Sequence, residues 1–568
     1  MDSTVVALKQ EMPVPAKRQF WNVLAAFIPW LLIVIWLSFH HAMGRDDVRA
    51  LSLALQGTNV AQMLRAVHGE GHPAIWFLLL RGAHSLVPRP QVLPAVSVIV
   101  AAAAALVLLI WSPFSMGMKA LILFGHMCLI EYSVVPRDYG IAMLALFAFV
   151  AIYDTHRERN LWPGVILFLL ANCHLLAILL VGCLLLLWLI DILTGGIADR
   201  RRAFRLFAAN AVLAAAGVFL CIRLSLPTFN DAAKVAHAPG TTFHLLLQAI
   251  FLPAEDFREL VFPAPLTIRL HVLPAALLSG MMYGSLLGLI RRPGALLAGA
   301  AMLLGLSGFF ALLSPGGYRH EALWLVMLIG TYWLALARRP VTRTAFPDSG
   351  RRLIQRQVVA GTLLFVAILL LQMPSSIHQV IRTARNGPPY SRSRDLAQLV
   401  KARPDLHDAI IIADPDYLVE PLPYYISNPT YLMRENRYGN VVHFTRHARL
   451  SISLGDILAT ARMLHQQTGK PIIILLEHRL HDVASAHMDT EGYDWVLTVK
   501  PDDIRSFLES TQFIMSFGPA MTDETFDVYT FGVASGSGRQ AGAATRCVGP
   551  DHGSTTVQPG GANNVRFS

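Results

Sequence analysis

The segment QVLPAVSVIVAAAAALVLLIW, residues Gln91–Trp111, carries no charged side chain over its whole length. A membrane-spanning helix needs about 20 predominantly apolar residues. The hydrocarbon interior offers no hydrogen-bond partners, so such a segment has to be a helix or a strand of a closed barrel. Because this run does not alternate between apolar and polar residues, it predicts a membrane-spanning helix.

Similar runs recur through the first two-thirds of the chain. Those free of charged residues are Gln19–Phe39, Ile141–Tyr153, Gly294–Gly317, Ala322–Ala337 and Val358–Pro374. Charged residues make up only 15% of the chain, against roughly 25% in soluble domains. Buried helices of a large soluble core are the alternative interpretation, but so many uninterrupted runs favour a polytopic α-helical membrane protein of about 11–13 spans.

The basic residues predict how the chain is oriented. Twelve candidate spans start near Gln19, His72, Gln91, Gly117, Asp138, Leu161, His174, Ala203, His271, Pro293, Tyr318 and Gln357. Arginine-rich loops mark the cytoplasmic side, and the strongest lies between Arg338 and Arg356. The net charge of +10 therefore reflects topology and does not indicate nucleic acid.

This orientation requires an odd number of crossings. Lys17 and Arg18 place the N-terminus in the cytoplasm, and the last span leaves the cytoplasm towards the C-terminal domain. Twelve candidates are therefore one too many or one too few, and the short segment His72–Val87 is the one we doubt. The location expected is a bacterial inner or plasma membrane. Gln19–Phe39 is interpreted as an uncleaved first span rather than a signal peptide.

The chain divides into four predicted regions. They are a cytoplasmic N-terminal segment (1–18), a multi-span module (19–373) with outer loops 40–72 and 227–270, an extracytoplasmic α/β domain (374–534) and a disordered tail (535–568). In the α/β domain, Ala409–Ala413 and Pro471–Leu476 are typical of buried strands. Asp502 is expected to cap a helix that ends at Ser510.

An acidic pair follows the first span. Asp46 and Asp47 lie at the outer membrane surface, where adjacent carboxylates can act as a general base or bind a divalent metal. The alternative is a solvated pair neutralised by Arg45 and Arg49.

Four further polar groups fall on the same predicted side. They are His72 before Pro73, the segment Glu131–Tyr139 with Arg137 and Asp138, His174, and the pair Tyr318-Arg319. Each has a structural alternative, such as a histidine at a helix start or an arginine that reaches the interface. An arginine can grip a phosphate with two parallel hydrogen bonds, so the group as a whole suits an anionic lipid-phosphate substrate.

The order of these motifs resembles the GT-C superfamily of glycosyltransferases. The resemblance is to its bacterial branch, similar to protein mannosyltransferases and the aminoarabinose transferases of lipid A. Asp46-Asp47 matches the acidic motif of the first external loop, and His72-Pro73-Ala74-Ile75-Trp76 is similar to an HPPLY-like segment. Tyr132, Arg137 and Tyr139 follow the family's later aromatic and arginine pattern. The sequence departs from the pattern at Ala74, where a second proline is usual, and in the reversed order of Tyr318-Arg319.

The resemblance implies an inverting transfer of a hexosyl or pentosyl group from a polyprenyl-phosphate donor. The acceptor that it implies is a lipid, a polysaccharide or a protein. Asp46 or Asp47 is expected to be the base, and these two would also be the ligands of any divalent metal. Residues expected to bind the donor phosphate are Arg137, Tyr139, Arg319, Tyr318 and His174, with His72 and Glu131 as further site residues.

Two other functions compete with this one. A polytopic lipid or polysaccharide transporter or flippase would need no transferase chemistry, but transporters usually show internal repeats, and none is evident here. A membrane-anchored sensor would use the C-terminal domain to bind its ligand, yet twelve candidate spans are far more than an anchor needs.

Overall fold

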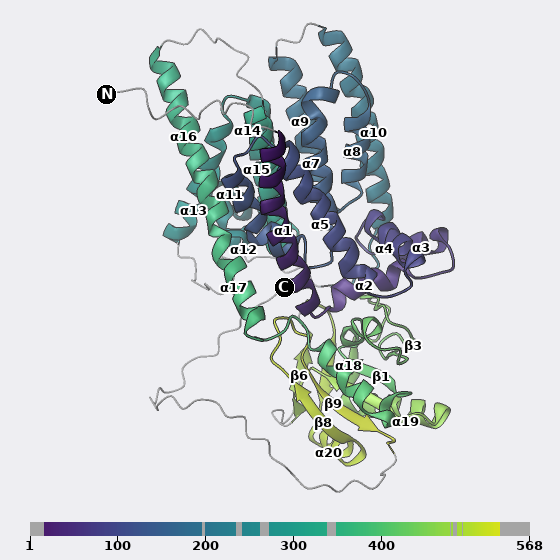
Figure 1. Cartoon of the computed structure of the whole chain (residues 1–568). Helices are drawn as coiled ribbons and strands as arrows, with labels where there is room; N and C mark the ends of the chain where they lie inside the picture. Colours follow the sequence, from purple (N-terminus) through teal and green to yellow (C-terminus); the bar gives the residue numbers. More distant parts are fainter. Residues whose placement is uncertain are drawn as a thin grey trace.

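The computed structural model describes residues 16–195, 199–233, 241–261, 272–337, 348–477, 479–480, 486–490 and 492–533. A bundle of helices carries an α/β domain at one of its ends (Figure 1). We call this the site end, and the opposite end, where α7 and α9 finish, the far end. The predicted tail 535–568 and most of the segment 1–18 lie outside the described residues.

Eight helices of the described residues are long and apolar enough to cross a membrane. They include α1 (Ala16–His40), α5 (Val92–Trp111), α7 (Tyr139–His156), α9 (Ala177–Thr194), α10 (Arg200–Ser225), α14 (Pro293–Leu312), α15 (Tyr318–Ala337) and α16 (Asp348–Leu371). Each coincides with a predicted span, so the predicted fold class, a polytopic helical module followed by an α/β domain, is confirmed.

The remaining predicted spans are shorter helices. They are α4 (Ile75–Leu86), α6 (Met116–Phe124) with a π-helical turn (Met127–Glu131), α8 (Trp162–Ala171) and α13 (Val272–Leu286). Helix α4 lies at the site end beside α2 (Arg45–Ala54) and α3 (Val60–Val67) (Figure 1). The odd number of crossings stays a prediction, and α4 at the site end is the segment that we doubt.

The predicted outer loop 227–270 is largely helical where the structure describes it. It contains α11 (Thr242–Phe251), a 3₁₀ turn (Pro253–Glu255) and α12 (Arg258–Val261). The hydroxyl oxygen of Ser307, within α14, lies 2.9 Å from the carbonyl oxygen of Ala249 and 2.5 Å from a carboxylate oxygen of Asp256. The predicted outer position of this segment stays a prediction, and within it α11 packs against α14 although it is too short to cross.

The far end holds a buried ion network. The Asp191 carboxylate accepts hydrogen bonds from Arg157 at 2.9 Å, from Arg292 at 2.6 Å and from Tyr153 at 3.1 Å. Arg292 also donates to the carbonyl oxygen of Leu334. Arg157, Asp191 and Arg292 are buried, and their ion pairs and hydrogen bonds join the ends of α7, α9 and α15.

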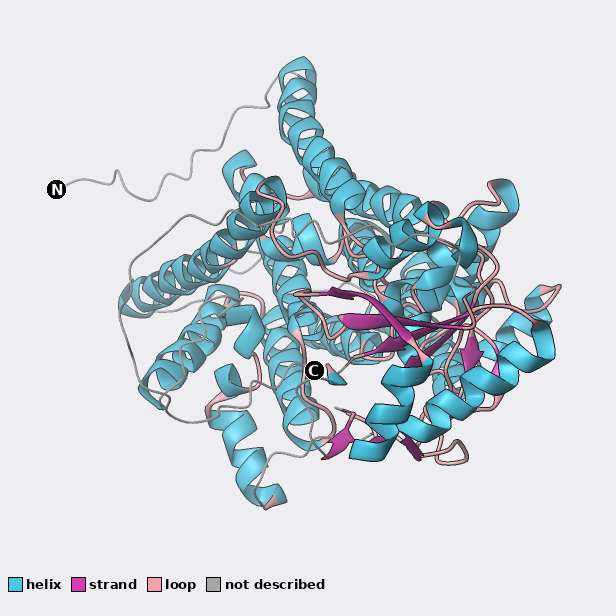
Figure 2. Ribbon diagram, turned by 90° about the horizontal axis from the view of Figure 1, so that it is seen from below, coloured by secondary structure: helices cyan, strands magenta, loops and turns pink. Residues whose placement is uncertain are grey.

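The C-terminal domain is connected to the bundle by α17 (Met373–Ala384), which follows α16 directly. Its main sheet has the order β1-β5-β9-β8, formed by β1 (Ile410–Asp414), β5 (Ile472–Leu476), β9 (Phe526–Phe531) and β8 (Gln512–Phe517). Strands β1 and β5 are parallel, and β9 is antiparallel to both of its neighbours. Seen from the site end, the strands lie in front of the helical bundle (Figure 2).

Both faces of β1 and β5 are covered, which explains why these two strands read as nearly continuous apolar runs. Ile411 and Ile473 face a cluster that includes residues of α18 (Ser393–Ala402). Ile410 and Ile472 face α19 (Leu454–Thr468) and α20 (Pro501–Ser510). The smaller strands are β2 (Tyr431–Leu432) with β3 (Arg437–Tyr438), and β4 (Ser451–Ser453) with β7 (Val496–Val499) and β6 (Ala486–Asp489).

Helix caps explain where the helices of this domain begin. Ser453 and Asp456 form a reciprocal capping box at the start of α19. The predicted cap at Asp502 was wrong, because α20 begins at Pro501 and its N-cap residue is Lys500, with no side-chain cap. Proline suits the first helical position, and it moves the start of the helix one residue ahead of Asp502.

Candidate functional site

The acidic pair opens helix α2, and the helix separates its two carboxylates. Neighbouring residues of a helix point about 100° apart. The side chain of Asp46 is 45% exposed, whereas that of Asp47 is fully buried. Asp46 is therefore open to a substrate, and Asp47 is enclosed by protein.

Asp47 is occupied by three protein donors. One oxygen accepts from the Gly44 backbone N–H at 3.0 Å and lies 3.1 Å from His41 Nε2. The other accepts from Arg137 Nε at 3.1 Å. Asp47 thus fixes the start of α2 and the position of Arg137.

Arg137 also contacts Asp46, with Nη2 2.9 Å from its carboxylate. Burial disfavours the ionised form, but the positive charges of Arg137 and Arg45 outweigh it and hold the pKa of Asp46 far below its usual range. The same balance, with the hydrogen bond to His41, lowers the pKa of Asp47. Both carboxylates are therefore ionised near neutral pH.

The C-terminal domain closes around the turn before α2. A Cβ atom on Gly44 would lie 2.9 Å from a ring carbon of Tyr390 and 3.0 Å from Glu524 Oε1. No side chain fits there without a shift, so the sequence needs glycine at this position. Tyr390 also lies within electrostatic range of Asp46, Arg137 and Arg319, which makes it a residue of the same site.

Two arginines of α2 fasten the membrane module to the C-terminal domain. Arg45 donates to Asp523 at 2.8 Å and its backbone N–H donates to Glu524 at 2.7 Å. Arg49 is buried and donates to two carboxylates. Its Nη2 lies 2.8 Å from Glu70, and its Nη1 donates to Glu420. The acidic pair is thus held by contacts from both modules.

A second cluster of polar side chains lies beside the first. His72 Nδ1 is 3.3 Å from Asp138 Oδ2, and the ring of His174 is 5.7 Å from that of His72. Burial lowers the pKa of His174 to about 4. Burial has the same effect on His72, but its hydrogen bond to Asp138 prevails and raises its pKa.

His72, Asp138 and His174 each place a potential ligand atom within 4.8 Å of the others. A metal at His174 Nε2 would need a lone pair there. The Leu176 backbone N–H donates to His174 Nδ1 at 3.1 Å, so the proton of the neutral ring sits on Nε2. The residues as arranged do not fit a metal at this cluster. The metal predicted at Asp46 and Asp47 stays a prediction. At these two carboxylates, Arg137 supplies a positive charge by contacting both of them.

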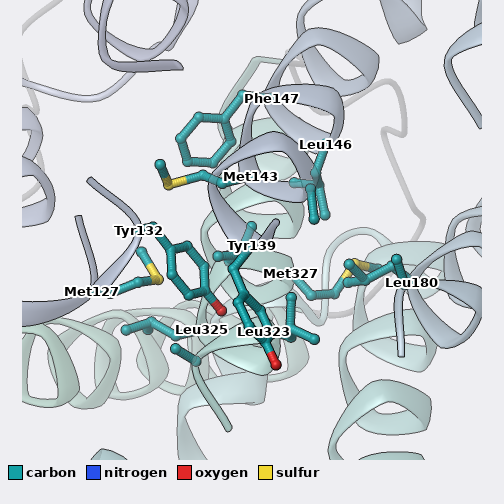
Figure 3. Packing of buried hydrophobic residues seen from close by; sticks show 14 of the residues in the cluster. Met127, Tyr132, Tyr139, Met143, Leu146, Phe147, Leu180, Leu323, Leu325 and Met327 are labelled. Carbon is teal, nitrogen blue, oxygen red and sulfur yellow. The ribbon is translucent and has the colours of Figure 1, made fainter. Parts of the chain in front are cut away.

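Two stacked tyrosines line one side of the cluster of His72, Asp138 and His174. Tyr132 and Tyr139 have ring centroids 5.6 Å apart and an interplanar angle of 18°, and their hydroxyls point the same way (Figure 3). Apolar side chains such as Met143 and Phe147 pack behind them (Figure 3). The free face of Tyr139 contacts His174, with centroids 4.4 Å apart.

Arg319, at the start of α15, completes the site. Its carbonyl oxygen accepts from the Tyr132 hydroxyl at 2.6 Å. Its Nη1 is buried and has no hydrogen-bond partner among the described residues. The charge of Arg319 helps to lower the pKa of Asp46, so the two side chains share one electrostatic environment.

Two of the predicted site residues have other partners. Tyr318 donates through its hydroxyl to Gln372, and its ring meets His126 edge-on at 4.7 Å. Glu131 lies 3.7 Å from His126 Nε2. The structure gathers Asp46, Asp47, Arg137, Tyr139, His72, His174 and Arg319, whereas Tyr318 and Glu131 lie on the His126 side of this group.

Sequence reasoning missed three residues of the site. His41 lies in the same predicted outer loop as Asp46, so it could have been found as a polar neighbour. His320 follows Arg319 directly, and its ring lies 5.9 Å from that of His174. Tyr390 comes from the C-terminal domain, and nothing in the local sequence indicates that it reaches the acidic pair.

Comparison with known proteins gives structural neighbours only. No protein-family model matches the chain, and no curated protein gives a significant match. Among solved structures, the chain is similar to ArnT from Cupriavidus metallidurans bound to undecaprenyl phosphate, with a TM-score of 0.45 and 13% sequence identity over 93% of this chain and 100% of that chain. The apo state of the same protein gives a TM-score of 0.47 and 13% identity over 92% of this chain and 99% of that chain.

Proposed function

We propose that this chain is a membrane glycosyltransferase of the GT-C type. It moves a sugar from a polyprenyl-phosphate-linked donor to a hydroxyl of an acceptor at the membrane surface that carries the C-terminal domain. The phosphate of the lipid carrier would bind the cationic groups of the site, and the half-exposed carboxylate of Asp46 would accept the proton of the acceptor hydroxyl.

The observation that carries the proposal is the charge pattern of the site. Asp46 is an ionised, half-exposed carboxylate, and Arg319 Nη1 is a buried donor without a partner among the described residues. A buried donor left unpaired costs about 1–3 kcal/mol or more when charged. A phosphate oxygen that binds Arg319 would remove this cost.

The reaction that we propose is a single displacement. The acceptor oxygen forms a bond to the anomeric carbon while the bond from that carbon to the phosphate oxygen breaks. The electron pair of the broken bond stays on the phosphate, which gains one negative charge next to Arg319. The acceptor proton passes to Asp46, and the anomeric configuration inverts.

A carboxylate with a low pKa is a weak base, and this limits when it can act. Efficient proton transfer needs donor and acceptor pKa values that are close. The acidity of the acceptor hydroxyl rises as its oxygen bonds to the sugar carbon. We therefore place the proton transfer late in the displacement, when the weak base Asp46 suffices.

Asp46→Asn tests the proposal with purified protein in detergent and a panel of polyprenyl-phosphate sugars. Asparagine keeps the size of the side chain and cannot take a proton. The release of polyprenyl phosphate should fall by about 10²–10⁴-fold, with unchanged thermal unfolding. Asp405→Asn, an exposed aspartate paired with Arg403 in the C-terminal domain, is the matched control.

The result that would contradict the proposal is turnover by Asp46→Asn at the wild-type rate. Wild-type protein that releases no polyprenyl phosphate from any donor would instead favour a transporter. The configuration of the product at its anomeric carbon, read by NMR, tests inversion separately.

The location that we propose is a bacterial inner membrane, with the basic loops in the cytoplasm and the C-terminal domain outside. The support is that the N-terminal helix begins at the far end and the C-terminal domain lies at the site end (Figure 1). Arg201→Cys and Asn436→Cys, each made in a chain whose own five cysteines are replaced by serine, test this by labelling in intact cells. Only the cysteine at 436 should react with an impermeant reagent.

A further inference from the structure

His320 has its Nδ1 atom fixed by the backbone. The Gly317 N–H donates to His320 Nδ1 at 3.1 Å. A backbone N–H can only donate, so Nδ1 has to present its lone pair. In the neutral imidazole the single proton is then on Nε2, on the side of the ring away from Gly317.

His174 has the same arrangement on another element. The Leu176 N–H donates to His174 Nδ1 at 3.1 Å. The two imidazole rings are 5.9 Å apart, and both contact Tyr139, with centroid distances of 4.4 Å for His174 and 5.6 Å for His320. Two separate backbone amides thus set two neighbouring histidines to donate through Nε2.

The surroundings keep these rings free of a proton on Nδ1. Burial lowers the pKa of His174 to about 4, and Arg137 and Arg319 lie in electrostatic range of His320. A third ring, His72, is 5.7 Å from His174 and is paired with Asp138. His174 and His320 are therefore uncharged hydrogen-bond donors, and they lie near the cations Arg137 and Arg319 and the carboxylate of Asp138.

We propose that His320 and His174 bind the phosphate of the lipid donor together, each through its Nε2–H. The inference rests on the proposed function and assigns to His320 a binding role that the sequence motifs do not indicate. Arg319 supplies the charge that matches the phosphate, and the two imidazoles add donors without adding to the repulsion between Arg137 and Arg319. Donors fixed in advance are worth most where charge develops during the reaction.

His320→Gln and His320→Asn separate this role from simple packing. The glutamine amide nitrogen reaches the position of Nε2, and the asparagine amide nitrogen that of Nδ1. We expect His320→Gln to bind undecaprenyl phosphate in detergent within about fivefold of wild type. His320→Asn and His320→Ala should bind about tenfold to a hundredfold more weakly, the range for a lost hydrogen bond to a charged group.

His174→Gln and His174→Asn should show the same order. His156→Asn, at the far end of α7, is the matched control and should bind as wild type. Thermal unfolding of every variant reports whether the bundle remains folded, and the rescue by glutamine is a result that a packing role would not give.

Equal binding by the Gln and Asn variants, at wild-type or at reduced affinity, would overturn the inference. So would stoichiometric zinc in the purified protein that is lost from His174→Asn and His320→Asn, because a metal needs the Nε2 lone pair. Failure of the wild type to bind undecaprenyl phosphate would count against the proposed function itself, and wild-type binding with unaffected His320 variants would count against this inference alone.

Discussion

The two ends of the helical bundle both contain buried arginines and aspartates, but they differ in how these are paired. At the far end, the Asp191 carboxylate is shared by Arg157, Arg292 and Tyr153. At the site end, Asp46 is half-exposed and Arg319 Nη1 has no partner among the described residues. Arg157 Nε at the far end is also buried without a partner among the described residues. The feature that distinguishes the site end is therefore the exposure of the Asp46 carboxylate, because the Asp191 carboxylate is buried.

The largest expected effect breaks the far-end network. Asp191→Ala leaves Arg157 and Arg292 without their shared partner, and breaking a buried ion pair costs about 3–5 kcal/mol. The free energy of unfolding in detergent should fall by that amount. Asp46→Ala should change it by less than about 1 kcal/mol, since an exposed pair is worth little. Equal losses of unfolding free energy in the two variants would contradict the proposed difference between the two ends.

The second effect concerns function at the site end. Arg319→Gln removes the unpaired donor, and loss of one such electrostatic donor costs about 10²–10³-fold in rate. The rate of sugar transfer should fall by this factor while the thermal stability stays near that of wild type. Arg292→Gln should do the reverse, with a large loss of stability, and transfer by Arg319→Gln at the wild-type rate would rule out its role at the phosphate.

The third effect is a pH dependence at the site end. Burial raises the pKa of Glu420 and of Glu524 from 4.5 to about 7. Above pH 4.5 the unfolded chain releases these two protons, whereas the folded state keeps them. Their contribution to the free energy of unfolding is therefore complete below pH 4.5 and is lost as the pH rises through 7. Each carboxyl contributes roughly 3 kcal/mol.

Thermal unfolding of the Glu420→Gln/Glu524→Gln double variant measures this. The midpoint of the wild type should drop between pH 5 and pH 7.5, and that of the double variant should drop less. Glu509→Gln, in α20, is the control and should follow the wild type. A wild-type midpoint that rises over this range would contradict the sign.

The smallest effect tests the edge of the site. The Arg45–Asp523 contact of 2.8 Å joins side chains that are 21% and 38% exposed, and such pairs contribute about 0.2–1 kcal/mol. Asp523→Asn should therefore lower the free energy of unfolding by less than about 1 kcal/mol. A loss as large as that of Asp191→Ala would show that the two ends are built alike.

The fold was predictable because a membrane span has a strong local signal. Apolar length and the arginine loops identify α1, α5, α7 and α16 without tertiary information. The same rules missed α11, because a helix of ten residues is too short to cross a bilayer. Its place against α14 depends on contacts such as that of Ser307 with Asp256, which pair residues 51 positions apart.

The site was predictable only as a set of nearby motifs. The sequence identifies Asp46-Asp47 and Tyr318-Arg319 as pairs, but adjacent residues of a helix diverge by about 100°. Asp47 consequently turns inward, and Tyr318 turns towards His126. The contribution of Tyr390 could not be predicted, because it depends on how the C-terminal domain docks.

That docking has a consequence for when activity begins. Gly44 is enclosed by Tyr390 and Glu524, and Arg394 donates to the carbonyl oxygen of His41 at 2.6 Å. A ribosome adds these three residues only after it has made every helix of the bundle. In the nascent chain, the acidic pair therefore lacks the residues of the C-terminal domain that hold it in place. We expect sugar transfer to start only once the C-terminal domain has been synthesised.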